Sequence, residues 1–179
     1  MNDAESPPHG ARESEVFELE NFLPYRLSLL TNTVSEGIAR GYRERHDISV
    51  PEWRVIAVLG RFPGLAASEI AERTAMDKVT VSRAVRRLSD NGLLERRADA
   101  VDRRRQRLHL TRGGGHDVLR HVVPLARLYE QRLLGALSGK EKELLRKLLE
   151  KLQERALAIN ETNGSALQNQ SQENKKGRE

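Results

Sequence analysis

The residues of this sequence best suited to chemistry are arginines gathered in one segment. Ten of the 31 lysines and arginines lie between residues 77 and 107, together with only five acidic residues. That segment nets +5, which equals the formal net charge of the whole 179-residue chain. Guanidinium groups pair with phosphate oxygens and with the edge of guanine, so such a surface suits nucleic acid. The charge count alone leaves open a merely solvated face.

Other kinds of site chemistry have little support. The chain has no cysteine, which excludes disulfides, thiolate metal sites and thiol redox switches. The five histidines are scattered, and the nearest pair, His116 and His121, lacks the four-residue spacing that aligns ligands on one helix face. We find no nucleophile–base pair, phosphate-binding loop or carboxylate dyad. The sequence therefore predicts no enzyme, no metal and no cofactor, with zinc sensing as a less favoured alternative.

The elements that must position the arginines begin with two short helical patterns. They span 66–73 and 77–91 and are separated by only three residues, which is typical of a helix-turn-helix. Ala75 lies in this turn, and we expect it in the right-handed region that alanine tolerates. Asp77 is suited to cap the second helix, because its carboxylate accepts from the first free backbone N–H groups.

The second helix has two faces of different chemistry. Its apolar face can pack on the preceding helix and comprises Val81, Val85 and Leu88. Its opposite face carries Thr80, Arg83 and Arg87, flanked by Val79 and Arg86. Small residues near the N-terminus followed by arginines suit a helix that enters the major groove, with Val79 against a thymine methyl and Arg83 on guanine. The alternative is an exposed amphipathic helix with incidental arginines.

A charged hairpin is predicted after Gly92. Residues 93–97 and 107–111 have the pattern of short strands, and the polar stretch 98–106 joins them. Asp102 lies two residues before Arg104 at the tip, where its carboxylate can orient that guanidinium for a narrow, electronegative minor groove.

Helices are predicted on both sides of this segment. A long amphipathic helix is expected over 16–45, a second from Pro51 to the stop at 62–64, and leucine-rich helices over 118–137 and 140–159. Ser138 and Glu141 have capping-box spacing. The fold class is thus mainly α with a small β-hairpin. The outer helices present more apolar face than one small lobe covers, which favours a dimer over a monomeric bundle.

Several blocks in this order resemble the MarR family of transcriptional regulators. They are PEWRVI at 51–56, SEIAER at 68–73, TVSR at 80–83, LSDNGLLERR at 88–97, DRR at 102–104 and LTRGG at 110–114. The resemblance implies a winged helix-turn-helix over about 48–112, dimerisation helices over about 16–45 and 113–160, and a domain of 15–160. Residues 1–14 and 161–179 are expected to be disordered tails.

The resemblance also implies a homodimer that binds a palindromic operator in double-stranded DNA and is released by a small effector. In this sequence Val79, Thr80 and Arg83 would then contact bases, and Arg104, oriented by Asp102, would enter the minor groove. The full set of expected DNA contacts is Ser68, Lys78, Val79, Thr80, Ser82, Arg83, Arg86, Arg87, Asp102, Arg103, Arg104 and Arg105.

The effector expected from the resemblance is an aromatic carboxylic acid or its CoA thioester. Arg26, an arginine amid apolar neighbours, is suited to pair with a carboxylate, although an internal ion pair is the more frequent role of a lone arginine. The residues expected to contact the effector are Tyr25, Arg26, Leu29, Asn32, His46, Trp53 and Arg54. A non-specific architectural DNA-binding protein without a ligand remains the rival interpretation. The sequence lacks signal-peptide and membrane-span patterns, so we expect a cytoplasmic protein with no membrane partner.

Overall fold

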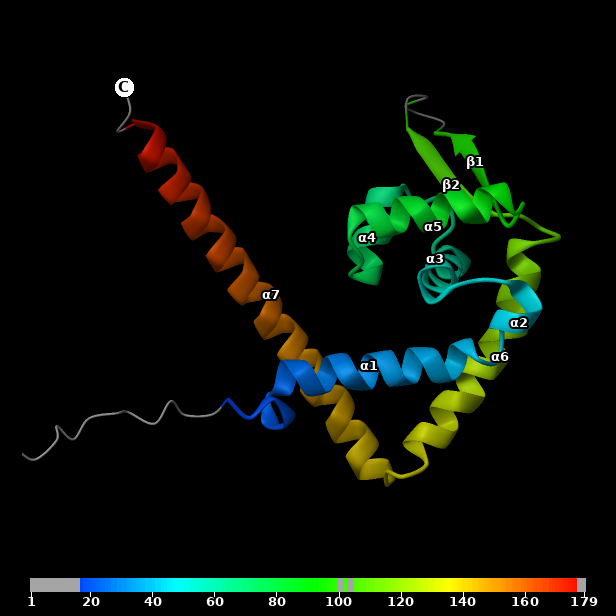
Figure 1. Ribbon diagram of the computed structural model, residues 1–179, viewed down its shortest axis with the longest axis horizontal. Coiled ribbons are helices and arrows are strands. Elements are labelled where there is room, and N and C mark those ends of the chain that lie inside the picture. Colours follow the sequence, from blue (N-terminus) through cyan, green and yellow to red (C-terminus); the bar gives the residue numbers. More distant parts are fainter. Residues whose placement is uncertain (1–16, 100–101, 103–104, 177–179) are drawn as a thin grey trace, which may run out of the picture. The chain divides into compact units, whose positions relative to one another are not determined.

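The computed structural model describes residues 17–99, 102 and 105–176 (Figure 1). The chain divides into two compact units, of which the first ends at Leu125 and the second begins at Ala126. The elements are η1 (Leu19–Asn21), α1 (Leu23–Ala39), α2 (Arg43–His46), α3 (Val50–Arg61), α4 (Ala67–Thr74), α5 (Lys78–Asp90), β1 (Leu94–Ala98), β2 (Gln106–Leu110), α6 (Gly115–Leu134) and α7 (Gly139–Lys176).

The expected single helix over 16–45 is wrong. Helix α1 ends at Ala39, and the short helix α2 follows after a turn that contains Gly41 and Tyr42. The break has a packing reason, since Ala39 and Tyr42 are both buried in the core. A Cβ at Gly41 would lie 3.5 Å from Leu125 of α6, so the chain passes close to that helix where it turns.

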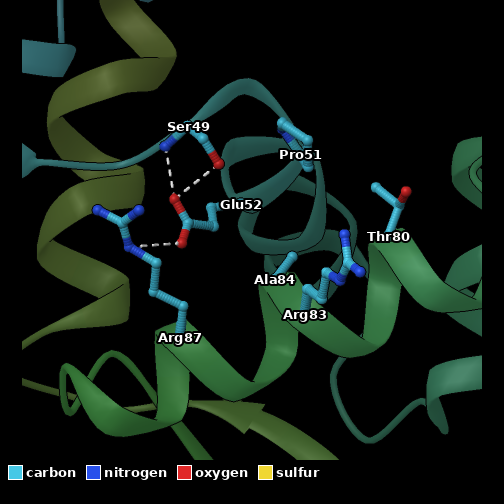
Figure 2. A pocket seen from close by; sticks show the side chains of 7 residues that line it. All are labelled: Ser49, Pro51, Glu52, Thr80, Arg83, Ala84 and Arg87. Carbon is cyan, nitrogen blue, oxygen red and sulfur yellow. Dashed lines mark hydrogen bonds and ion pairs between the residues drawn. The ribbon is translucent and has the colours of Figure 1, made fainter.

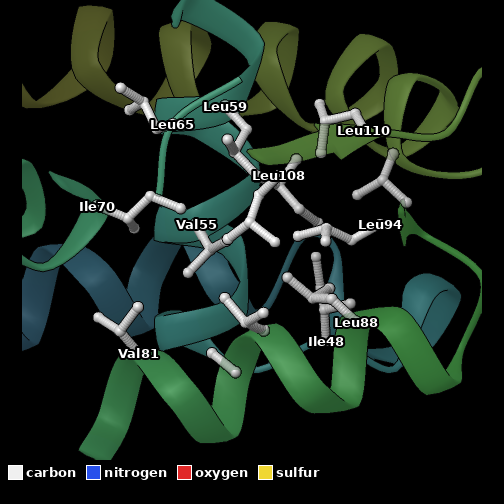
Figure 3. Packing of buried hydrophobic residues seen from close by; sticks show 14 of the residues in the cluster. Ile48, Val55, Leu59, Leu65, Ile70, Val81, Leu88, Leu94, Leu108 and Leu110 are labelled. Atoms are coloured by element: carbon white, nitrogen blue, oxygen red, sulfur yellow. The ribbon is translucent and has the colours of Figure 1, made fainter. Parts of the chain in front are cut away.

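The core of the first unit lies between α3, α4, α5 and the hairpin (Figure 3). Val81 and Leu88 of α5 pack inward, confirming the apolar face predicted for this helix. Strands β1 and β2 pair antiparallel in the register Leu94↔Leu110. Leu108 is fully buried and also donates its backbone N–H to the Leu65 carbonyl at 3.0 Å. The hairpin is therefore attached to the loop between α3 and α4 as well as to its own partner strand.

The turn of the helix-turn-helix differs from expectation in one respect. Ala75 has φ 52° and ψ 31°, so it adopts the left-handed conformation and not the right-handed one we expected. The turn needs this conformation because the Ala75 and Met76 N–H groups fold back on the last carbonyls of α4. Glycine adopts it without strain, whereas a Cβ costs about 1–2 kcal/mol.

The start of α6 packs on the first unit, with Val118 and Val122 buried in its core. In the second unit, the Ser138–Glu141 capping box predicted from the sequence is confirmed, since each residue's backbone N–H donates to the other's side chain. Helix α7 continues to Lys176, past residue 160 where we expected order to end. Its last stretch contains no proline, the residue that most strongly breaks a helix. The tail over 1–14 lies outside the described residues.

Within the described part of the chain, no helix is both long and apolar enough to span a lipid bilayer.

Candidate DNA interface

The start of α5 is fixed by Asp77, as the sequence predicted. Asp77 Oδ1 accepts from the Thr80 backbone N–H at 2.8 Å, and Oδ2 accepts from the Thr80 hydroxyl at 2.5 Å. These two hydrogen bonds, the hydroxyl's first, lower the pKa of the Asp77 carboxyl below its ordinary value. The Thr80 hydroxyl gives its proton to the cap, so it is left to act as a hydrogen-bond acceptor toward any further partner.

The outward face of α5 is accessible along its length. Val79 is 59% exposed, which is unusual for a valine in a folded domain, and Lys78, Ser82 and Arg83 are exposed around it. Arg86 is exposed too and approaches Asp90 only loosely, at 3.9 Å. An exposed apolar side chain at a helix start, surrounded by donors, is the arrangement that a major-groove contact requires.

Arg87 has a different environment from the other arginines of α5 (Figure 2). Its Nε donates to Oε1 of Glu52 at 3.1 Å, and its Nη2 donates to Asp47 Oδ2 at 3.0 Å. Glu52 is 2% exposed, and its Oε2 accepts from the Ser49 backbone N–H and hydroxyl at 2.5 and 2.7 Å. Arg87 therefore ties α5 to the start of α3.

Glu52 is one of the residues that our sequence analysis missed. The spacing of Ser49 and Glu52 is that of a capping box, and this signal could have located it. A hollow of about 270 Å³ lies beside the pair, between the start of α3 and α5 (Figure 2). It is lined by Ser49, Pro51, Glu52, Thr80, Arg83, Ala84 and Arg87.

The hairpin formed by β1, β2 and the loop between them is called the wing below. It is held at the base of its loop by a second arginine, Arg107. Its guanidinium binds Asp99, where the loop begins, and Glu69 of α4. Asp102 is exposed and pairs with Arg105 at 3.6 Å. Arg103 and Arg104 lie outside the described residues, so the expected pairing of Asp102 with Arg104 stays a prediction.

The start of α4 lies next to the wing. Ser68 is exposed there, and a hollow of about 440 Å³ separates this end of α4 from β2. Its lining includes Ser68, Arg105 and Gln106. The candidate phosphate contacts Ser68 and Arg105 thus face the same space.

The expected effector residues form two groups. Trp53 packs on Tyr42 with ring centroids 5.9 Å apart, and the Arg54 guanidinium donates to Ser35 Oγ of α1 at 3.3 Å. Trp53 and Arg54 both lie on α3, whereas His46 ends α2 and its ring contacts His121 of α6. Burial raises the pKa of Tyr42 to about 12, so its phenol stays protonated.

The second group is Tyr25, Arg26, Leu29 and Asn32, all exposed on α1. At the rise of an α-helix, Tyr25 lies about 15 Å along α1 from Ser35, the contact of Arg54. Only Asn32 comes near the first group along the helix. A small aromatic acid therefore cannot reach both Tyr25 and Arg54 within one protomer.

A histidine pair joins α2 to α6, which sequence spacing could not reveal because the residues are 75 apart. His46 Nε2 and His121 Nδ1 lie 2.6 Å apart, and Arg45 Nη1 lies 3.3 Å from His121 Nε2. A guanidinium only donates, so we infer that His121 carries its proton on Nδ1 and donates to His46. Burial, then His121 and Arg45, lower the pKa of His46. No cluster of three or more potential metal ligands occurs among the described residues.

A helix-turn-helix with an outward arginine face, followed by a two-stranded hairpin with a basic loop, defines the winged helix-turn-helix class of DNA-binding proteins. Comparison with known proteins identifies the family within this class. A family model described as MarR family matches residues 46–105. The transcriptional regulator HosA of Escherichia coli O127:H6 is 31% identical over 114 residues, which cover 64% of this chain and 84% of HosA. The chain belongs to the MarR family of transcriptional regulators and is not an enzyme.

Solved structures agree with this assignment. A probable transcriptional regulator from Pseudomonas aeruginosa has a TM-score of 0.66 and 28% identity, covering 75% of this chain and 98% of that one. BpsR of Bordetella bronchiseptica, whose DNA binding is regulated by 6-hydroxynicotinic acid, has the same TM-score at 22% identity, covering 74% and 94%. The likeness to BpsR shows a common fold.

Proposed function

We propose that this protein is a homodimeric, ligand-released repressor that binds a palindromic operator. The observation that carries the proposal is the outward face of α5, where the exposed Val79 lies among Lys78, Ser82 and Arg83 on a helix capped by Asp77. In this role α5 enters the major groove, with Val79, Thr80 and Arg83 on base edges.

The remaining expected contacts divide by position. Lys78, Ser82 and Arg86 flank the reading face and are suited to phosphates, as are Ser68 at the start of α4 and Arg105 at the wing. Arg103 and Arg104 supply the minor-groove contact, with Asp102 beside them in the sequence. Arg87 supports recognition from within, through Glu52.

Self-association is supported by apolar residues that neither unit covers. In α1 these include Leu23, Leu27 and Leu30, and in α7 Leu144, Leu148 and Leu152, each at least 39% exposed. The first set recurs at four- and three-residue steps and the second at four-residue steps, the pattern of a helix face that packs on another helix. A second copy of the chain is the partner that a two-fold operator requires.

An aromatic carboxylate or aryl-CoA effector is proposed on the chemistry of Trp53 and Arg54 of α3 and of His46 at the end of α2. Trp53 offers a ring face, and Arg54 and His46 offer donors for a carboxylate. The exposed group on α1, including Tyr25 and Arg26, would contact a longer effector such as a CoA thioester, or one held against the partner subunit.

The test is a binding titration against the DNA upstream of the protein's own gene and a scrambled control, at two salt concentrations. It is repeated with aromatic acids, including 6-hydroxynicotinic acid, and with CoA thioesters. Preference for the upstream fragment that one compound abolishes supports the proposal. Equal affinity for both DNAs without a ligand effect favours the architectural alternative, because phosphate contacts alone do not discriminate.

Two substitutions test the residues proposed to contact the base edges and the minor groove. Arg83→Ala is expected to lower specific affinity by about 1–3 kcal/mol with little effect on scrambled DNA. Arg104→Ala is expected to reduce the preference for sites with a narrow minor groove. If neither variant weakens specific binding, these residues do not read the operator.

A further inference from the structure

Arg107 lies on β2, next to the wing loop, and its side chain is only 28% exposed. Its Nε donates to Asp99 Oδ2 at 2.5 Å, and its Nη1 donates to Glu69 Oε2 at 2.8 Å and to the Gly64 carbonyl at 3.3 Å. These acceptors belong to the wing loop, to α4 and to the turn before α4. The hydrogen bond to Asp99 also raises the pKa of the guanidinium above its ordinary value. Arg107 is therefore engaged by groups of its own chain, although it also lines the hollow between α4 and β2.

Both carboxylates that Arg107 binds also hold backbone. Glu69 Oε2 accepts from the Ala66 N–H at 2.7 Å, at the start of α4. Asp99 Oδ1 accepts from the Asp102 N–H at 3.1 Å, within the wing loop. A continuous set of hydrogen bonds thus leads from the start of α4, through Arg107 and Asp99, to Asp102.

A hairpin of two five-residue strands does not fix its own direction, because such ribbons twist easily and are marginally stable alone. The half of the hairpin away from its loop is held by Leu108, which donates to the Leu65 carbonyl and accepts from the Gly64 N–H, and by the buried Leu94 and Leu110. Arg107 adds a second attachment, on the side of the loop. Two attachments define the angle of the wing against α4, and α4 packs directly on α5.

We propose that Arg107 is a positioning residue for DNA recognition, which sets the wing at the angle where its tip and α5 reach neighbouring grooves together. This inference rests on the proposed function, in which the wing tip contacts the minor groove. Lysine cannot replace arginine here. Its single ammonium keeps the charge but cannot direct separate N–H groups at Asp99, Glu69 and Gly64.

The experiment compares the wild type with Arg107→Lys and Arg107→Gln. The matched control is Arg112→Lys, an exposed arginine just past the other end of β2. Kd is measured for the operator and for scrambled DNA. Hydrogen exchange is measured without DNA at two backbone amides of the wing. These are the Asp99 N–H, which donates to the Arg105 carbonyl, and the Arg105 N–H, which donates to the Asp102 carbonyl. The Leu108 amide is the internal reference.

For Arg107→Lys we expect operator affinity to fall roughly 10- to 100-fold while affinity for scrambled DNA changes less than about threefold, because the charge is retained. Exchange at Asp99 and Arg105 should accelerate, with Leu108 unchanged. Arg107→Gln should behave alike at the operator, and Arg112→Lys should resemble the wild type.

Three results separate the inference from the proposed function. Normal operator binding by Arg107→Lys overturns the inference. Loss of binding by Arg107→Gln alone, with exchange unchanged, also overturns it, since a direct phosphate contact then explains the effect. If the wild type itself shows no operator preference, the proposed function fails, and the exchange data still decide whether Arg107 holds the wing.

Discussion

Replacing the buried Glu52 by glutamine tests whether α5 is held against α3 by a carboxylate. Three donors converge on this group, the Ser49 N–H, the Ser49 hydroxyl and Arg87 Nε. A glutamine of the same shape has one oxygen and one NH₂ group, so it must turn a donor toward Arg87 or toward Ser49. The NH₂ group of the glutamine then points at an N–H or O–H donor, and that donor loses its acceptor.

The magnitude follows from what is lost. A charge-assisted hydrogen bond and a mismatched buried group cost about 1–3 kcal/mol of unfolding free energy. Arg87 is about half exposed and retains Asp47 as a partner, so the lower part of this range applies. Glu52→Ala also removes half of the capping box and should cost about 1 kcal/mol more.

The assay is urea unfolding at one fixed protein concentration, because the stability of the proposed dimer would depend on concentration. Glu72→Gln, an exposed residue of α4, is the control and should change stability by less than about 0.5 kcal/mol. A double-mutant cycle with Arg87→Gln should show coupling of about 1 kcal/mol. A Glu52→Gln protein as stable as the wild type, with no coupling to Arg87, would refute the reasoning.

Two further predictions concern the turn and the histidine pair. Ala75→Gly should stabilise the protein by about 1 kcal/mol, because it relieves a positive φ, whereas Ala57→Gly within α3 should destabilise it by a similar amount; urea unfolding of both variants checks the sign. The pKa of His46 is lowered from its ordinary 6.5, so the unfolded state takes up the proton first and stability should decline as pH falls below 6.5. His121→Asn removes the partner histidine, and a comparison of urea midpoints at about pH 7.5 and about pH 5.5 should then show a smaller decline; an equal decline would contradict the assignment to this pair.

Local sequence signals predicted the helix-turn-helix and the hairpin of this fold. The apolar face of α5, its Asp77 cap and the β1–β2 hairpin each depend on residues close to one another in the sequence. The spacing of residue types was therefore enough to predict them. The left-handed Ala75 was mispredicted because alanine tolerates a right-handed turn, and only the need to return to the carbonyls of α4 excludes it. The break after Ala39 was missed because the periodicity of α1 continues through a segment that buries Tyr42.

Contacts distant in sequence could not be predicted in this way. Arg87 meets Asp47 across 40 residues, and Arg107 meets Glu69 across 38. In the sequence both arginines belong to the same basic run as Arg83, and residue type gives no sign that their charges are used differently. Only the packing of α3 and α4 against α5 and the hairpin brings the acidic partners to them.

This division changes what the net charge of the basic segment means. Phosphate contacts set the salt dependence of binding, with about one counterion released per contact. Arg87 and Arg107 contribute to the count of ten basic residues, yet each is bound to two carboxylates of its own chain. A salt titration should therefore report fewer phosphate contacts per protomer than the sequence suggests. The two arginines contribute to recognition through geometry, since one holds α5 and the other holds the wing, and the relative placement of these elements decides which operators fit.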